Sequence, residues 1–146
     1  MNMRDDVLKN GAKLSIYQGD NSWIETNGVE VNLVLTPRIG SRSIGITSAV
    51  HQPGQGFEPH LHPISEEVLI CIKGKGEFYL KDKWIPVSEG DIVFAPPGVL
   101  HGTRNPAGNT EIFVTVGCGA PPQLDLYQRS NYNPLADDQE TQAGTK

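Results

Sequence analysis

The sequence has little of what would assign it to several large protein classes. It contains two cysteines, Cys71 and Cys118, in 146 residues, too few for a disulfide framework. Its longest apolar run spans residues 68–72, far below the roughly 18 residues that cross a bilayer. No apolar segment typical of a secretion signal follows Met1. We therefore expect a cytoplasmic protein that has no membrane partner.

Positive charge is scarce as well. The chain has 12 basic and 17 acidic residues, a net charge of −5, whereas binding to nucleic-acid phosphates or to an anionic membrane requires basic clusters. We therefore expect no nucleic-acid partner. The length is close to the roughly 150 residues typical of one domain, and 16 glycines and 11 prolines spread along the chain indicate many turns.

The interior of the chain lacks the apolar periodicity of long helices. Eight short segments rich in Val, Ile, Phe and Thr are each bounded by turn-forming residues, which is typical of β-strands. These segments cover residues 29–35, 44–50, 68–72, 77–80, 84–87, 91–95, 99–103 and 111–116. Their number predicts an all-β fold, a small jelly-roll β-barrel. We expect an N-terminal arm (1–28), the barrel (29–117) and a C-terminal extension (118–146) with a partly disordered tail.

Three of the four histidines stand in a pattern that fits a metal site. His60 and His62 are two residues apart, so on an extended segment both face the same side, with Cα atoms about 6.8 Å apart. Glu67 begins the next apolar segment, and His101 follows a Pro-Pro-Gly corner. Imidazole and carboxylate suit a divalent transition metal, namely Fe, Mn, Zn, Ni or Co. Taken singly, each residue also fits a solvated turn or a hydrogen-bonded core position, and we interpret His51 as a non-ligand.

The spacing of these residues resembles the two sequence motifs of the cupin superfamily. The first motif, G-x5-H-x-H-x(3 or 4)-E-x6-G, is matched by Gly54, His60, His62, Glu67 and Gly74. The second, G-x5-P-x-G-x2-H-x3-N, is matched by Gly90, Pro96, Gly98, His101 and Asn105. The resemblance implies a small single-domain cupin with a jelly-roll barrel. It also implies one divalent metal ion per chain, with the ligands His60, His62, Glu67 and His101.

The choice of Glu67 over the adjacent Glu66 depends on spacing and on alternation. Six residues separate Glu67 from Gly74, as the motif requires, whereas seven separate Glu66 from it. If Glu67 faces inward, Glu66 points away from the metal. Cys71 then lies on the inner face, too far along the strand to be a ligand. We therefore expect Cys71 to be a small buried core residue and Asn105 to brace a loop.

The resemblance leaves the activity open between two classes. A complete ligand set favours a metal-dependent enzyme of the dioxygenase, decarboxylase or lyase type that acts on a small polar organic molecule. The alternative is a non-catalytic module that binds a small molecule or a sugar. No acid or base is assigned, and the candidates without a motif are Gln55, Glu58, Tyr79, Tyr127 and Tyr132. Resemblance to small cupins further implies a homodimer.

Overall fold

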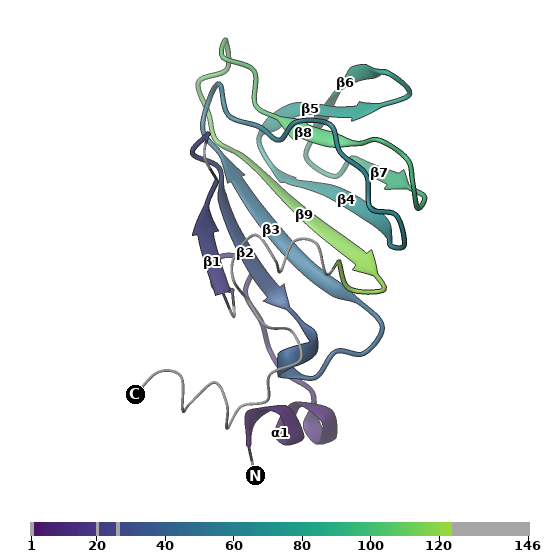
Figure 1. Ribbon diagram of the computed structural model, residues 1–146. Helices are drawn as coiled ribbons and strands as arrows, with labels where there is room; N and C mark the ends of the chain where they lie inside the picture. The colour runs from purple at the N-terminus through teal and green to yellow at the C-terminus, as the bar shows by residue number, and fades with distance from the viewer. Residues whose placement is uncertain (1, 20, 26, 124–146) are drawn as a thin grey trace.

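The structure, a computed structural model, describes residues 2–19, 21–25 and 27–123. The expected extension beyond Gln123, with Tyr127 and Tyr132, lies outside the described residues. In chain order the elements are α1 (Met3–Asn10), β1 (Asn21–Ile24), β2 (Glu30–Leu35), η1 (Pro37–Ile39), β3 (Gly45–His51), β4 (Glu66–Lys73), β5 (Lys75–Leu80), β6 (Lys83–Ser88), β7 (Ile92–Ala95), β8 (Gly102–Arg104) and β9 (Phe113–Ala120), as Figure 1 shows.

The strands form two antiparallel sheets. The larger sheet has six strands in the order β1-β2-β3-β9-β4-β7, and the smaller has three in the order β6-β5-β8. β9 pairs with β3 on one side and with β4 on the other, so the last described strand joins the two halves of the larger sheet. The prediction of an all-β jelly roll is confirmed. In the described part of the chain no strand is shared between the two sheets, so the barrel is open.

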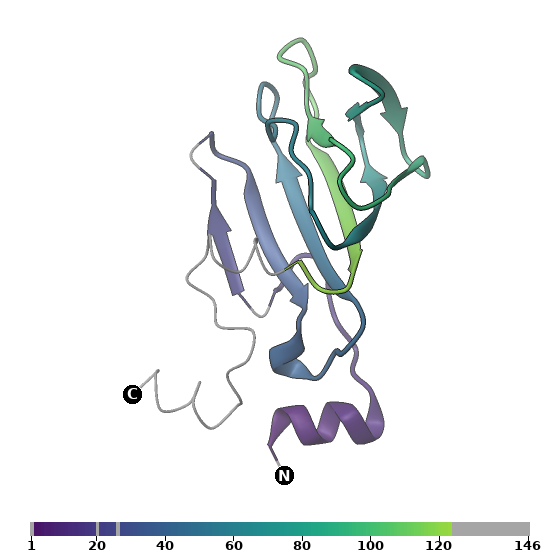
Figure 2. The same cartoon turned by 45° about the vertical axis from the view of Figure 1, so that its right-hand side comes forward.

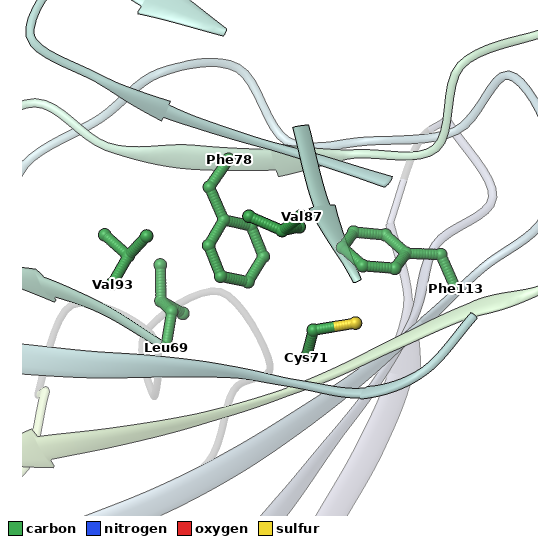
Figure 3. Packing of buried hydrophobic residues seen from close by; sticks show 6 residues of the cluster. All are labelled: Leu69, Cys71, Phe78, Val87, Val93 and Phe113. Carbon is green, nitrogen blue, oxygen red and sulfur yellow. The ribbon is translucent and has the colours of Figure 1, made fainter. Parts of the chain in front are cut away.

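The smaller sheet lies over one part of the larger sheet (Figure 2). The hydrophobic core lies between the smaller sheet and the β4–β7–β9 part of the larger one (Figure 3). Alternate residues of β4 face this core, because successive side chains of a strand point to opposite faces. The main buried cluster consists of Leu69, Cys71, Phe78, Val87, Val93 and Phe113. Cys71 is 1% exposed, which confirms its interpretation as a core residue. A second cluster, Val29, Val31 and Ala49 with Phe57 packed against it, lies over β2 and β3.

Two elements near the N-terminus were not predicted. Helix α1 buries none of its residues, so it has no apolar periodicity to detect. Capping interactions at both ends stabilise the helix instead. The Asn2 side chain accepts a hydrogen bond from the backbone N–H of Asp5, and Gly11 ends the helix with φ of 79°. β1 lies within the expected N-terminal arm and pairs with the edge of β2.

None of the helices among the described residues is both long and apolar enough to cross a membrane.

Candidate metal site

The two motif segments are brought together by backbone pairing. His60 lies in the connection between β3 and β4, and His101 lies directly before β8. The two residues exchange both backbone hydrogen bonds, each 2.8 Å long, as a hydrogen-bonded antiparallel pair does. The backbone N–H of Gly98 also donates to the carbonyl of His62 over 2.9 Å. The turn before His101 is therefore tied to the His60–His62 segment.

Three imidazoles and one carboxylate converge at this junction. One ring nitrogen from each of His60, His62 and His101 lies within 4.8 Å of the other two. Glu67 reaches the same place from β4: its Oε1 is 2.9 Å from Nε2 of His101 and 3.7 Å from Nε2 of His62. His62, His101 and Glu67 are buried, and His60 is half-buried. The four residues that the sequence singled out thus lie together at one site.

Hydrogen bonds to carbonyl groups orient two of the imidazoles. Nδ1 of His60 lies 2.8 Å from the carbonyl oxygen of Glu58, and Nδ1 of His101 lies 2.9 Å from that of Val99. Since a carbonyl oxygen only accepts, Nδ1 carries the proton in each ring. In the neutral imidazole Nε2 then has an unshared electron pair, as a metal ligand requires.

This tautomer makes the contact between His101 and Glu67 informative. If the His101 ring is neutral, its Nε2 and the Glu67 carboxylate are both acceptors, yet they lie 2.9 Å apart. Two acceptors at that distance repel each other unless a proton or a metal cation lies between them. The donor set therefore fits a divalent transition metal, for which imidazole and carboxylate are suitable ligands.

The electrostatics of the site keep its ligands in the metal-binding form. Burial lowers the pKa of His60, and the neighbouring His101 and His62 lower it further against the opposing effect of the Glu58 carbonyl. Burial raises the pKa of Glu67, but the neighbouring His101, the hydrogen bond from Gln123 and the neighbouring His62 together outweigh burial, so its pKa is lowered on balance. At neutral pH His60 is therefore neutral and Glu67 ionised.

The neighbouring residues take the positions that alternation predicts. Glu67 is 5% exposed, while Glu66 faces solvent. His51 is fully buried outside the cluster, with Nδ1 3.0 Å from the carbonyl of Phe113 and Nε2 2.8 Å from Oγ1 of Thr103. Asn105 donates from its amide nitrogen to the carbonyls of His51 and Glu111, so it braces a loop as expected.

A small cavity of about 50 Å³ lies beside the four residues. Its lining adds Thr47, Thr115, Gly117 and Gln123, which sequence reasoning missed. Gln123 belongs to no motif. The only signal of this part of the site in the sequence was the pair of glycines, Gly117 and Gly119, on either side of Cys118. The acid–base candidates Gln55, Glu58 and Tyr79 are not part of the lining; the Tyr79 ring packs on Trp84 instead.

The absence of a side chain at Gly117 makes room for the Glu67 carboxylate. A Cβ at this position would lie 2.7 Å from Oε2 of Glu67 and 3.2 Å from Oγ1 of Thr47. We expect Gly117→Ala to keep the fold but to displace the carboxylate and weaken metal binding by about tenfold, as loss of ligand support does. Chelator competition measures this affinity. Gly108→Ala, which meets nothing within 4 Å, is the matched control, and equal affinities for the two variants would contradict the expectation.

His51 predicts a loss of stability in mild acid. Burial lowers its pKa from 6.5 to about 4, against weaker opposing hydrogen bonds to the carbonyls of Phe113 and Ala49. Between pH 6.5 and pH 4 the unfolded chain therefore binds a proton that the folded chain does not, so stability is complete above this range and falls within it. We expect about 2 kcal/mol to be lost between pH 8 and pH 5 from this residue.

Urea unfolding of the metal-free protein at the two pH values measures that loss. His51→Gln removes the titrating group and leaves the other histidines in place. Its stability should fall by about 2 kcal/mol less than that of the unchanged protein. The same pH dependence in both proteins would show that His51 is not responsible.

Comparison with known proteins identifies the domain type. The profile of the cupin domain matches residues 49–116. Acireductone dioxygenase from Branchiostoma floridae is 40% identical over 50 residues, which are 31% of this chain and 28% of that enzyme. Acireductone dioxygenase 1 from Vitis vinifera is 31% identical over 88 residues, 52% of this chain and 46% of that enzyme. The chain thus spans less than half the length of either relative.

A solved structure extends the likeness to the fold. A cupin-like protein from Thermotoga maritima superposes with a TM-score of 0.61 and 26% identity, covering 77% of this chain and 84% of the other. The match of the cupin-domain profile, residues 49–116, includes all four residues of the candidate site.

Proposed function

Because this chain belongs to the cupin superfamily, we propose that it is a metal-dependent enzyme that acts on a small polar organic molecule. The observation that carries the proposal is the convergence of three imidazoles, with one ring nitrogen of each within 4.8 Å of the others and Oε1 of Glu67 2.9 Å from Nε2 of His101. We propose that His60, His62, Glu67 and His101 hold one divalent transition metal ion there. When bound, such an ion supplies a Lewis acid and a template for a chelating substrate, and Fe(II) adds the capacity to react with O₂.

Among dioxygenase, decarboxylase and lyase chemistry, we propose a dioxygenase that contains iron or, as second choice, manganese. Three relatives that match this chain are named acireductone dioxygenases, which supports oxygen chemistry. In an oxygenolytic cleavage both oxygen atoms enter the products and the substrate supplies all four electrons, so no separate reductant is needed. The cavity of about 50 Å³ supports a small substrate.

Oxygen consumption tests this activity. The protein is loaded anaerobically with Fe(II) and mixed with a panel of small enediols, α-hydroxy acids and diketones. We expect O₂ uptake with at least one of them and none with His62→Ala. If a panel compound raises the melting temperature of the iron-loaded protein but is neither oxidised with O₂ uptake nor converted to any other product, the protein is a non-catalytic binding module instead.

We also propose that a second copy of this chain covers the outer face of β4 and β7. Val68 pairs with Phe94 and Ile70 with Ile92 across these strands, and their side chains point away from the core. Ile92 is 62% exposed and Phe94 52% exposed, an apolar patch on the edge strand of the sheet. Such an edge can meet its own copy across a two-fold axis. Light scattering should give a dimer, and Ile92→Glu a monomer; a monomeric unchanged protein would contradict the proposal.

A further inference from the structure

Gln123 joins the candidate site from a segment outside both sequence motifs. It lies three residues beyond the end of β9, and its side chain is 4% exposed and lines the cavity. Its Nε2 donates to Oε2 of Glu67 over 2.6 Å. Gly119 makes this position available, because a Cβ there would lie 2.8 Å from the Gln123 amide nitrogen. Gln123 therefore holds one oxygen of Glu67, while the other faces His101 and His62.

The direction of the Gln123 amide follows from its partner. An ionised carboxylate only accepts hydrogen bonds, so the nitrogen end of the amide has to face Glu67 and the oxygen end has to face away. That oxygen, Oε1, is buried and has no hydrogen-bond partner within the described part of the chain. A buried acceptor without a donor is costly, and native structures leave few of them. A molecule in the cavity can supply the missing donor.

We propose that Gln123 is a ligand-recognition residue whose Oε1 accepts a hydrogen bond from a hydroxyl group of the small molecule bound in the cavity. The ligand class is a small acid or enediol that carries a hydroxyl donor next to a chelating oxygen. Nε2 of the same side chain meanwhile holds Glu67 in place. This inference rests on the proposed function, because the ligand shares the cavity with the metal.

Two probes that differ in the hydroxyl group test the assignment. Glycolate and oxalate are both two-carbon chelators, but only glycolate carries a hydroxyl donor at neutral pH. Their binding to the Co(II)-loaded protein is followed by the visible absorption of cobalt, at cobalt concentrations that saturate each variant. Cobalt affinity is measured separately by chelator competition, because loss of the Glu67 support is expected to weaken it by about 10- to 100-fold.

The test variant is Gln123→Met, which keeps the length of the side chain and removes both amide groups. We expect it to bind glycolate about three- to tenfold more weakly, the effect of one lost hydrogen bond, and oxalate within about twofold of the unchanged protein. Gln52→Met makes the same chemical change at an exposed position outside the cavity lining, and should alter neither affinity.

Equal loss of affinity for both probes, or loss for neither, would overturn the recognition role. If Gln123→Met does not fold, Gln123→Asn replaces it; its shorter side chain cannot reach Glu67 and the ligand together, so the same selective loss is expected. Cobalt binding by the unchanged protein without selective loss in the variants overturns only this inference. Failure of the unchanged protein to bind cobalt overturns the proposed function as well.

Discussion

Replacing His62 with alanine is expected to weaken the binding of a divalent metal ion by at least about a hundredfold while the protein stays folded. Loss of a residue that only supports a ligand already costs about 10- to 100-fold in metal affinity, so loss of a ligand costs at least the upper end of that range. The fold should survive, because His62 ties the turn at Gly98 through its backbone carbonyl, which alanine retains.

Chelator competition with Fe(II) or Co(II) measures the affinity, and circular dichroism reports the fold. Glu66→Gln is the matched control, since Glu66 adjoins a proposed ligand but faces solvent. Glu67→Gln should weaken binding, whereas Glu66→Gln should leave it within about twofold of the unchanged protein, as surface changes do. Unaltered binding in His62→Ala would remove His62 from the ligand set.

The second large effect is expected in the core between the two sheets. Phe113 is completely buried and packs against the rings of Phe78 and His51, with centroid distances of 5.9 Å and 5.1 Å. Phe113→Ala removes these contacts and leaves a cavity, which lowers the free energy of unfolding by about 3–5 kcal/mol. Urea unfolding measures the change at neutral pH.

Tyr17→Ala is the control for Phe113→Ala. It also removes an aromatic ring, but from a side chain that is 57% exposed. Surface changes of this kind alter stability by about 0.5 kcal/mol or less. A similar loss in both variants would mean that the core cluster shown in Figure 3 does not carry the stability assigned to it.

The strands of the barrel were predictable because their residues report on local structure. β-Branched segments bounded by glycine and proline mark β2 to β9, and alternation along β4 places Glu67 and Cys71 on the inner face. Helix α1 was not predictable from periodicity, since capping and charge form it without a buried face. β1 adds to the sheet through backbone pairing, which leaves little trace in side-chain type.

The residues of the candidate metal site were likewise predictable only in part. His60, His62, Glu67 and His101 stand at fixed spacings within short segments, so sequence alone could group them. Gln123 meets Glu67 across 56 positions of the chain, and the contact depends on the path of the chain after β9. Such a contact carries no local pattern. The identity of the metal, the substrate, the dimer, the domain limits and the cytoplasmic location remain predictions.

The most direct test of the account is the metal content of the untagged protein, purified without chelators or nickel resin, beside that of His62→Ala. We predict about one iron or manganese ion per chain in the unchanged protein, because its four donors suit one divalent ion, and loss of that ion in the variant. Absence of any bound metal, even after reconstitution with Fe(II), Mn(II) and Zn(II), would contradict the central claim that these residues form a metal site.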